Sequence, residues 1–414
     1  NSIATNPERG YQIAMKYITP LTYSERQLMI EWLGQGLISR EKIQSLYPEL
    51  YSYTSVSNLN VDAENMWINS YIDEYRKSKI SNRPTDLISQ LILDKNSSSA
   101  SFEMWYNNFK TVKTILHNRE DIDVYYWIDG LGVDWIPLVK RVIAEKKEQM
   151  IFLNEILIAR SLLPTKTEIN KKDLQRLLPK DKVLEKSGDL DGLAHRTDNI
   201  SPFTINKEVE LVRKSIEDIL NRYIGKKIAI ISDHGLTYLS QLVQGKNMAG
   251  VESDHHGRIA IRKTTTEITD NSYYRLDDKV TLCALKHESL CAKVPAGQGI
   301  HGGCTPEETL VPIFIISSCP AATDWSAELI TPEINATEPR VKFAIKNLPS
   351  TYMPFIRYNN TRYKMRHILN DVYESEDMIL DANVTDVILT IGDVENIVKI
   401  KISTGVIEDD LFAM

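Results

Sequence analysis

The sequence predicts an α/β layered protein with a mostly parallel sheet, preceded by a helical segment and followed by a small β domain. Short apolar runs, typical of strands buried on both faces, recur between about residues 123 and 318 and end in turn residues. Amphipathic stretches with helical spacing separate these runs. Strands that alternate with helices indicate crossover connections, and these join parallel strands.

Four buried strands are expected in this central segment, at residues 124–128, 156–159, 227–231 and 309–316. The helices between them are expected at about residues 134–147, 168–178 and 206–223. Together they predict an α/β core over residues 119–320.

Each flank of the core has its own pattern. Apolar residues repeat with helical spacing at 25–37 and 61–75, and residues 82–86 carry a helix-start signal, so residues 1–118 are expected to form a helical docking domain. Short alternating runs at 341–345, 352–358, 384–391 and 396–402 predict an antiparallel β domain over residues 321–414. No chemistry is expected in either flank.

Composition limits the classes of function. The chain has 414 residues, 42% hydrophobic and 25% charged, which suits a globular protein of two or three domains. Its net charge of -7 argues against a broad basic surface for nucleic acid. The longest apolar stretch, at 310–316, is far shorter than the roughly 20 residues that span a bilayer, so no membrane partner is expected.

The location is expected to be cytoplasmic. Four cysteines without C-x-x-C spacing are expected to stay reduced: Cys283, Cys291, Cys304 and Cys319. The chain starts at Asn1 rather than at a methionine, and no charged-then-apolar leader is visible. The sequence is therefore expected to be a piece of a longer protein.

Residues that can bind metal ions follow the expected strands. Asp129 follows the first strand, Asp233 and His234 follow the third, and His301 stands in a glycine-rich loop before the fourth. Asp191 and His195 have the i, i+4 spacing that puts two side chains on one helix face. Each motif alone has an ordinary alternative: a cap, a solvated helix pair or a loop histidine. Together they place three carboxylates and three imidazoles at one sheet edge, where α/β proteins bind ligands.

Mixed nitrogen and oxygen ligands suit zinc, with manganese or iron as competitors. Two divalent ions bring four positive charges against three carboxylates, so the combined site would attract a phosphate. Two ions about 3.5–4 Å apart can bind both the attacking and the bridging oxygen of a phosphate ester.

The ordered set of motifs resembles the alkaline phosphatase superfamily and, within it, the PglZ family of bacterial phage-defence systems of the BREX type. The matching stretches lie at residues 126–130, 163–168, 191–195, 231–235 and 301–312, and they cover about half of the chain. The resemblance implies an alkaline-phosphatase-like core and partners among other defence-system proteins.

The resemblance also implies residue roles. Asp129, Asp233 and His234 would bind one ion, and Asp191, His195 and His301 would bind the second. Thr167 would be the nucleophile, because a divalent ion lowers the pKa of a bound hydroxyl. A phosphorylated threonine would then be hydrolysed by water. The ordinary alternative is that Thr167 only caps a helix, and Thr165 is the second candidate nucleophile.

Other polar residues of the core leave alternatives open. His256 and Arg258 could contact a substrate phosphate, or residues 258–262 could be an alternating strand with its charges in solvent. His255, His256 or His287 could take the place of a proposed ligand. His117 and His367 lie outside the core, and Cys304 is expected to be a small buried residue.

Three functions are compatible with these features. The first is a metal-dependent phosphoesterase, with family context favouring a phosphodiesterase whose substrate is a nucleotide or oligonucleotide. The second is a phosphate-sensing or scaffolding subunit of a defence complex, with little turnover. The third, a phosphomutase, ranks last because it needs a large lid inserted in the core, for which the core segment is too short.

Overall fold

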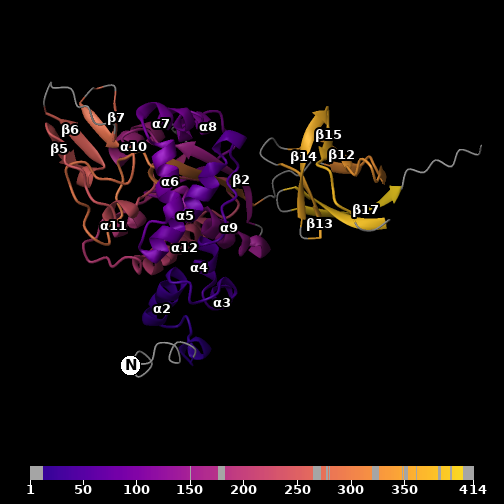
Figure 1. The fold of residues 1–414 in the computed structure, drawn as a ribbon, viewed down its shortest axis with the longest axis horizontal. Helices are drawn as coiled ribbons and strands as arrows, with labels where there is room; N and C mark the ends of the chain where they lie inside the picture. Colours follow the sequence, from indigo (N-terminus) through magenta and orange to yellow (C-terminus); the bar gives the residue numbers. More distant parts are fainter. Residues whose placement is uncertain are drawn as a thin grey trace, which may run out of the picture. The chain divides into compact units, whose positions relative to one another are not determined.

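The computed structural model describes residues 13–149, 151–175, 182–263, 272–276, 278, 280–318, 326–346, 348, 353–359, 361–380, 384–391 and 394–403. The chain is a mixed α/β protein that divides into two compact units, Asn1–Pro320 and Ala321–Met414 (Figure 1). Each unit has its own hydrophobic core.

A five-stranded sheet organises the first unit. Its strands are β1 (Val124–Ile128), β2 (Phe152–Arg160), β3 (Val183–Ser187), β4 (Ile228–Ile231) and β9 (Leu310–Ser317). Their order across the sheet is β2-β9-β4-β1-β3. β1 is parallel to both β3 and β4, whereas β9 is antiparallel to both β4 and β2. Four strands therefore share one direction and β9 runs against them, so the sheet that the sequence predicts as mostly parallel contains one antiparallel strand.

The direction of β9 has a topological cause. The chain leaves β4 at the sheet edge where the parallel strands end, and it returns to the sheet through the short helix α13 (Pro306–Thr309), directly before β9. Among the described residues between β4 and β9, no helical crossover carries the chain back to the opposite edge, so β9 starts where the others finish. The residues that precede β9 thus lie beside the residues that follow β1, β2, β3 and β4.

Helices cover both faces of this sheet, which makes three layers. Tyr125 and Trp127 of β1 pack on one face with Val112 and Leu174, which belong to the helices α8 (Val112–Leu116) and α10 (Thr167–Gln175). Residues of β1 that alternate with these pack on the other face against α9 (Ile136–Ala144) and α12 (Thr204–Arg222).

The expected core elements agree with the observed ones to within a few residues. β2 is longer than predicted, and the end of the helix expected over residues 168–178 lies outside the described residues. β3 is not among the expected strands. A further helix, α11 (Asp189–Ala194), follows β3 directly.

The helices before β1 join the core of the first unit. They are α2 (Tyr23–Gly34), α3 (Arg40–Leu46), α4 (Pro48–Tyr53), α5 (Trp67–Ser81), α6 (Asp86–Lys95), α7 (Ser99–Tyr106) and α8. The helix start predicted at 82–86 is confirmed, because the Thr85 side chain accepts a hydrogen bond from the Ile88 N–H. A buried ion pair of 2.8 Å between Lys79 and Glu208 joins α5 to α12.

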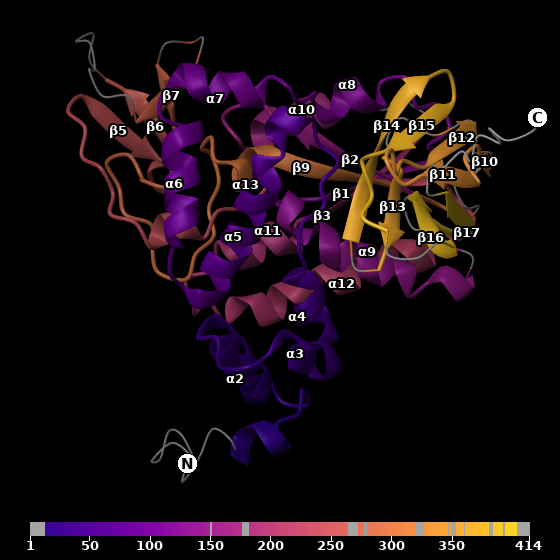
Figure 2. The ribbon, with the colours of Figure 1, turned by 45° about the vertical axis from the view of Figure 1, so that its right-hand side comes forward.

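A second, antiparallel sheet is inserted between β4 and β9. It contains β5 (Val251–Asp254), β6 (Ile259–Arg262), β7 (Tyr273–Arg275) and β8 (Thr281–Ala284), in the order β5-β6-β8-β7. In both Figure 1 and Figure 2, the strands β5 to β7 lie at one side of the first unit and β2 at the other.

Short 3-10 helices lie at Ala63–Asn65, Val133–Trp135, Lys147–Gln149, Leu239–Gln241 and His255–Gly257.

The second unit is an eight-stranded, mostly antiparallel sheet, which agrees with the expected β character. Its strands are β10 (Ser326–Leu329), β11 (Glu333–Asn335), β12 (Lys342–Lys346), β13 (Phe355–Tyr358), β14 (Thr361–Leu369), β15 (Val372–Ser375), β16 (Val384–Ile391) and β17 (Val394–Ser403). They are ordered β10-β12-β15-β14-β13-β16-β17-β11, and β11 is parallel to β17. Phe343, Ile356 and Leu389 are among the residues of its core.

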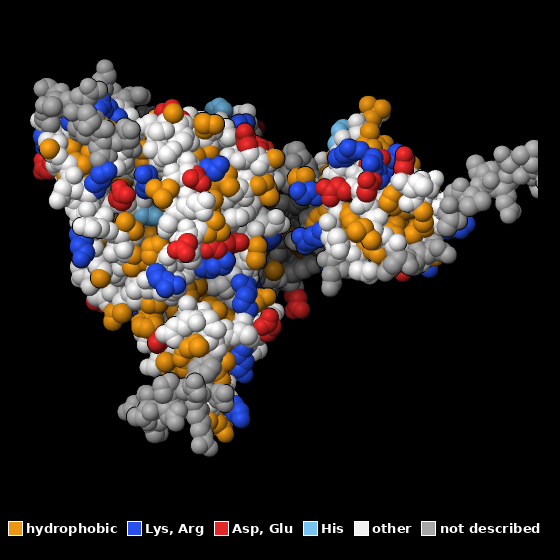
Figure 3. All heavy atoms as spheres, viewed as in Figure 1, with side chains coloured by type: hydrophobic (Ala, Val, Ile, Leu, Met, Phe, Trp, Pro, Cys, Tyr) orange, Lys and Arg blue, Asp and Glu red, His pale blue; other side chains and the backbone are white. Residues whose placement is uncertain are grey.

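The surface agrees with the composition. On the face drawn in Figure 3, lysine and arginine side chains are interspersed with aspartate and glutamate. Among the described residues, no helix combines the length and the apolar character that crossing a bilayer requires. Of the four cysteines, Cys283, Cys291 and Cys304 are free thiols, and Cys319 lies outside the described residues.

Candidate metal centre

The candidate metal centre lies at the edge of the five-stranded sheet where the parallel strands end. Asp129 directly follows β1, and Asp233 and His234 follow β4 after one serine. Asp191 belongs to α11, which follows β3, and His301 lies in the segment that leads to β9. Because β9 is antiparallel to its neighbours, His301, which precedes β9, lies at the same sheet edge as the residues that follow the other strands.

Asp129, Asp233 and His234 form the first group, called here the first triad. All three are buried, and their candidate ligand atoms lie within 4.8 Å of one another. The His234 Nε2 atom is 3.4 Å from Asp129 Oδ1 and 3.4 Å from Asp233 Oδ2. The Gly130 N–H, 3.4 Å from Asp233 Oδ1, links the turn after β1 to the turn after β4.

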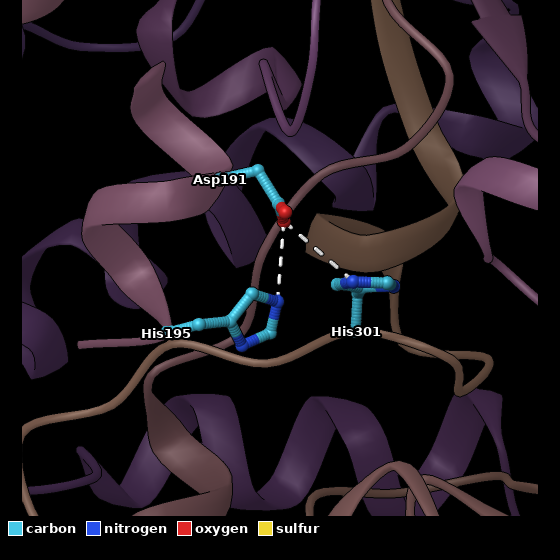
Figure 4. Close-up of side chains that lie close together, drawn as sticks. All are labelled: Asp191, His195 and His301. Carbon is cyan, nitrogen blue, oxygen red and sulfur yellow. Dashed lines mark ion pairs between the residues drawn. The ribbon is translucent and has the colours of Figure 1, made fainter. Parts of the chain in front are cut away.

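Asp191, His195 and His301 form the second triad, again with ligand atoms within 4.8 Å of one another. Figure 4 shows the Asp191 carboxylate, on α11, pointing toward the ring of His195 at the end of the same helix and toward His301 from a separate loop. Asp191 Oδ1 is 3.3 Å from His195 Nε2 and 3.6 Å from His301 Nε2. The i, i+4 spacing thus puts Asp191 of α11 and His195, the residue directly after α11, on one side, as the sequence predicts.

The two triads adjoin. The rings of His234 and His301 stack with centroids 3.8 Å apart and planes inclined by 17°. One residue of each triad therefore contacts the other triad, and the six side chains make one continuous cluster. These are the two sets of residues that the family resemblance implies; their role as ion ligands stays a prediction.

Backbone carbonyls fix the orientation of two of the histidines. His234 Nδ1 is 3.1 Å from the Gly235 oxygen, and His301 Nδ1 is 2.6 Å from the Thr165 oxygen. A carbonyl can only accept a hydrogen bond, so Nδ1 is the donor in both rings. In the neutral ring, the lone pair then lies on Nε2, the atom that faces the carboxylates of each triad. Such an outer hydrogen bond is the usual way in which a metal-binding histidine is held.

Burial and charge act on the acidic groups in opposite ways. Burial and the neighbouring Asp233 raise the pKa of Asp129 to about 6, against a smaller lowering by His234. Burial also raises the pKa of Asp191, but the close contact with His195 and the charges of His301 and His234 lower it overall. Crowded carboxylates in a buried site indicate that cations belong among them.

The hydroxyl of Thr167 points into the first triad. It lies 3.2 Å from Asp129 Oδ1, to which it can donate, and 3.2 Å from His234 Nε2. Thr167 is the first residue of α10, so backbone N–H groups at a helix start surround it. The side chain therefore contacts residues on two other segments, which a helix cap alone would not require.

Thr165 has a different position from the one that a nucleophile needs. It is fully buried, and its hydroxyl donates to the Gly303 oxygen at 3.1 Å and accepts from the Gly302 N–H at 2.8 Å. Its hydroxyl and its carbonyl together hold the loop that carries His301. Thr165 is thus a support of the second triad.

Arg258 fits neither of the two alternatives that the sequence left open, a phosphate contact or a charge in solvent. The side chain is fully buried and makes two hydrogen bonds to Glu308, of 2.5 Å and 3.0 Å. Its remaining terminal nitrogen donates to the backbone oxygens of Lys286 and Glu288. Because Glu308 also accepts from the Gly303 N–H at 2.9 Å, Arg258 supports the His301 loop and is not free to bind a phosphate.

The other histidines lie outside both triads. His287 is buried, with Nε2 3.0 Å from the Tyr71 hydroxyl and 3.3 Å from Glu307. The ring of His255 lies 5.2 Å from that of His301, and its Nδ1 is 3.3 Å from Asp254. Cys304 is fully buried, as expected for a small core residue.

One further observation indicates that the residues of the two triads suit divalent ions. Asp191 Oδ1 and Asp233 Oδ2 are buried carboxylate oxygens that no well-directed hydrogen bond satisfies among the described residues, although histidine nitrogens of the triads lie 3.3–3.6 Å away. A buried, unpaired carboxylate oxygen is costly, and a coordinated cation removes that cost. Oxygen and imidazole ligands together suit zinc, with manganese as the competitor.

Lys186 is a residue of the centre that the sequence motifs do not indicate. Its ammonium is 2.5 Å from Asp129 Oδ2 and lies 4.1 Å above the ring centre of Trp127. It reaches this place because Lys186 of β3 is the cross-strand partner of Trp127 of β1. Only the register of the two strands could have revealed it.

Comparisons with known proteins give a limited result. No protein-family model matches the chain, and no curated protein matches its sequence. Solved structures that match include murine ectonucleotide pyrophosphatase/phosphodiesterase 5 in an inactive form with AMP, at 15% identity and a TM-score of 0.25, over 36% of this chain and 51% of that one. The human protein matches at 15% and 0.25, over 34% of this chain and 50% of that one.

A further structure of the murine protein matches at 13% identity and a TM-score of 0.25, over 51% of this chain and 65% of that one. The matched regions span half to about two thirds of those proteins. Likeness at this level carries no argument about the chemistry of the present chain, which depends on its own residues.

Proposed function

We propose that this protein is a metal-dependent phosphoesterase in which Thr167 is the nucleophile and the two triads bind two divalent ions, zinc or manganese. The observation that carries the proposal is the position of the Thr167 hydroxyl, 3.2 Å from two members of the first triad. A nucleophile must lie beside the group that activates it, and this hydroxyl does. The adjoining second triad supports a site with two ions rather than one.

The residues of the chain have separate tasks in this reaction. Bound ions would supply positive charge for the phosphoryl oxygens and lower the pKa of the threonine hydroxyl. The Thr167 oxygen, having released its proton, forms a bond to phosphorus while the ester P–O bond breaks, and the departing alcohol takes up a proton. Water then attacks the phosphorus, breaks the bond to the Thr167 oxygen and restores the hydroxyl. One water molecule is consumed for each ester bond cleaved.

The family resemblance extends the proposal to substrate and setting. A nucleotide or short oligonucleotide diester is the favoured substrate, within a bacterial phage-defence system whose other proteins are partners. The net charge of -7 and the interspersed charges on the face drawn in Figure 3 support a small substrate rather than a long duplex, because tight duplex binding needs many lysine and arginine contacts.

The alternative is a phosphate-sensing or scaffolding subunit with little turnover. It has the same ions and phosphate affinity but no covalent step. The buried oxygens of Asp191 and Asp233 that no hydrogen bond satisfies are compatible with it, because they favour bound ions whether or not a covalent step follows. Turnover is therefore the property that separates the two functions.

The test is hydrolysis of p-nitrophenyl phosphate and bis-p-nitrophenyl phosphate by the metal-loaded chain, with bound metal measured in parallel. Thr167→Ala should retain metal and lose turnover by about 1,000-fold or more, since removing a nucleophile leaves only binding and electrostatic effects. Thr167→Ser should keep part of the activity. Cleavage of the diester alone would support the phosphodiesterase.

Thr111→Ala is the matched control. Thr111 is also at a helix start, and its hydroxyl accepts from the Thr114 N–H at 3.2 Å. This variant should lose about 1 kcal/mol of stability and no activity. If Thr167→Ala behaves in the same way, Thr167 is a helix cap and the proposed mechanism is wrong. A wild-type chain that binds metal and phosphate without turnover would support the sensing subunit instead.

A further inference from the structure

Lys186 is a cation placed against the first triad. Among the described residues, it is the lysine or arginine that forms an ion pair with a triad carboxylate, at 2.5 Å from Asp129 Oδ2. Lys166, the other lysine near Thr167, has its ammonium 2.9 Å from Asp254. The guanidinium of Arg258 is bound to Glu308. These two cations are thus engaged elsewhere, and Lys186 is the one that the triad holds.

Asp129 uses its two oxygens for two different neighbours. Oδ1 faces the Thr167 hydroxyl and His234, whereas Oδ2 holds the Lys186 ammonium. The Asp129 carboxylate therefore contacts the candidate nucleophile through one oxygen and the Lys186 ammonium through the other. A phosphoryl group that approaches the Thr167 oxygen comes within reach of that charge.

The lysine is both oriented and accessible. The Trp127 ring, itself 2% exposed, supports the ammonium from below at 4.1 Å, so the side chain cannot turn freely. Its side chain is nevertheless 37% exposed, whereas that of Asp129 is 6% exposed. An ammonium has three donors, and Asp129 occupies one of them. The remaining donors can bind an anion that enters from solvent.

We propose that Lys186 is a phosphate-binding residue of this site, which donates to a non-bridging phosphoryl oxygen while Asp129 and Trp127 hold it beside Thr167. This inference deepens the proposed function and rests on it. Two divalent ions and three carboxylates sum to one positive charge, and Lys186 raises this to two. The added charge favours binding of a phosphate group. A hydrogen bond from the ammonium to a charged phosphate oxygen is also stronger than the hydrogen bond to water that it replaces.

The same position predicts an opposite effect on metal binding. The ammonium and a divalent ion are like charges around one carboxylate, so Lys186 disfavours the ion that Asp129 attracts. Removing the lysine charge should therefore weaken phosphate binding and leave zinc binding equal or tighter. A residue that only stabilised the fold would weaken both.

The experiment is calorimetric titration of the full chain with zinc and then with inorganic phosphate. In Lys186→Met, which keeps the length of the side chain, phosphate affinity of the zinc-loaded protein should fall about 10- to 100-fold, the effect of losing one charged hydrogen bond. Zinc affinity should not fall. Lys186→Arg should restore part of the phosphate affinity, because it restores the charge.

Lys182→Met is the matched control. Lys182 lies just before the other end of the same strand and donates to the Glu120 oxygen at 3.1 Å, so phosphate affinity should not change. Unchanged phosphate affinity in Lys186→Met, or an equal loss of zinc and phosphate affinity, would overturn the role of Lys186. A wild-type chain that binds neither zinc nor phosphate would overturn the proposed function itself.

Discussion

The buried Thr165 hydroxyl positions a candidate metal ligand, His301, without being a ligand itself. It bonds to both Gly302 and Gly303, next to His301. Thr165→Val keeps the shape and removes both hydrogen bonds, so stability should fall by about 1–3 kcal/mol. Zinc affinity should fall by about 10- to 100-fold, as is typical when the support of a metal ligand is lost. Urea denaturation and zinc titration measure the two effects.

Thr204→Val is the control for that substitution, because Thr204 is also buried and lies in α12. It should lose stability without a change in zinc affinity. Equal zinc affinity in Thr165→Val and the wild-type chain would show that the His301 loop does not depend on this hydroxyl.

Short motifs predict residues of the site when the chemistry lies in neighbouring positions. Asp191 with His195 and Asp233 with His234 could be found in this way. Lys186 could not, because only the pairing of β3 with β1 brings it to Asp129. The pattern at 258–262 left open whether Arg258 contacts a phosphate or lies in solvent, whereas its actual partner, Glu308, lies 50 residues further along the chain. A charge that is neutralised by so distant a partner leaves no local signal.

Between elements, Glu307 links the helix α5 to the segment before β9. It accepts from the Tyr71 hydroxyl at 2.7 Å and is 3.3 Å from His287. Burial by itself would raise the pKa of Glu307. The interactions with His287, Thr237 and Tyr71 outweigh burial and lower the pKa from the ordinary value of 4.5 to about 2. Because the folded pKa lies below the ordinary value of 4.5, the carboxylate stabilises the fold above pH 4.5. That stabilisation is lost as the pH falls from 4.5 toward 2.

Glu307→Gln should therefore cost about 3 kcal/mol at pH 7, because each unit by which the folded pKa lies below 4.5 corresponds to about 1.4 kcal/mol of stability. The difference from the wild-type chain should shrink as the pH falls below 4.5. Urea denaturation at pH 7, 5 and 3.5 measures it, with the exposed Glu31→Gln as control. A difference that stays constant over this range would show that the Glu307 carboxylate is not the group that titrates.

Three of the strands that the sequence predicted, β1, β4 and β9, are buried on both faces, whereas the fourth, β2, is mostly half-buried. Every residue of β1 and β4 is buried, and both appear as continuous apolar runs. β3 is half exposed and contains Glu185 and Lys186, so its pattern resembles a loop. The direction of β9 could not be predicted either, because an apolar run has the same pattern in a parallel and in an antiparallel strand.

At the scale of the whole molecule, the two units have separate cores, and the triads belong to the first. Ligands stabilise only the folded state that binds them. Thermal unfolding of the full chain should therefore show two transitions, and zinc should move only one. At a free zinc concentration of 100 Kd, the stabilisation is about 2.7 kcal/mol. At about 2–4 °C for each kcal/mol, the shift should be about 5–10 °C.

Differential scanning calorimetry with and without zinc measures this shift, and a chelator should reverse it. The transition of the second unit is an internal control, because none of its described residues belongs to a group of side chains that could bind a metal ion. Asp233→Asn should abolish the zinc effect, since it removes a carboxylate that faces His234. The buried carboxylate oxygens of the triads that no hydrogen bond satisfies indicate that the first unit binds ions. If zinc moved both transitions equally, or neither, that conclusion would be wrong.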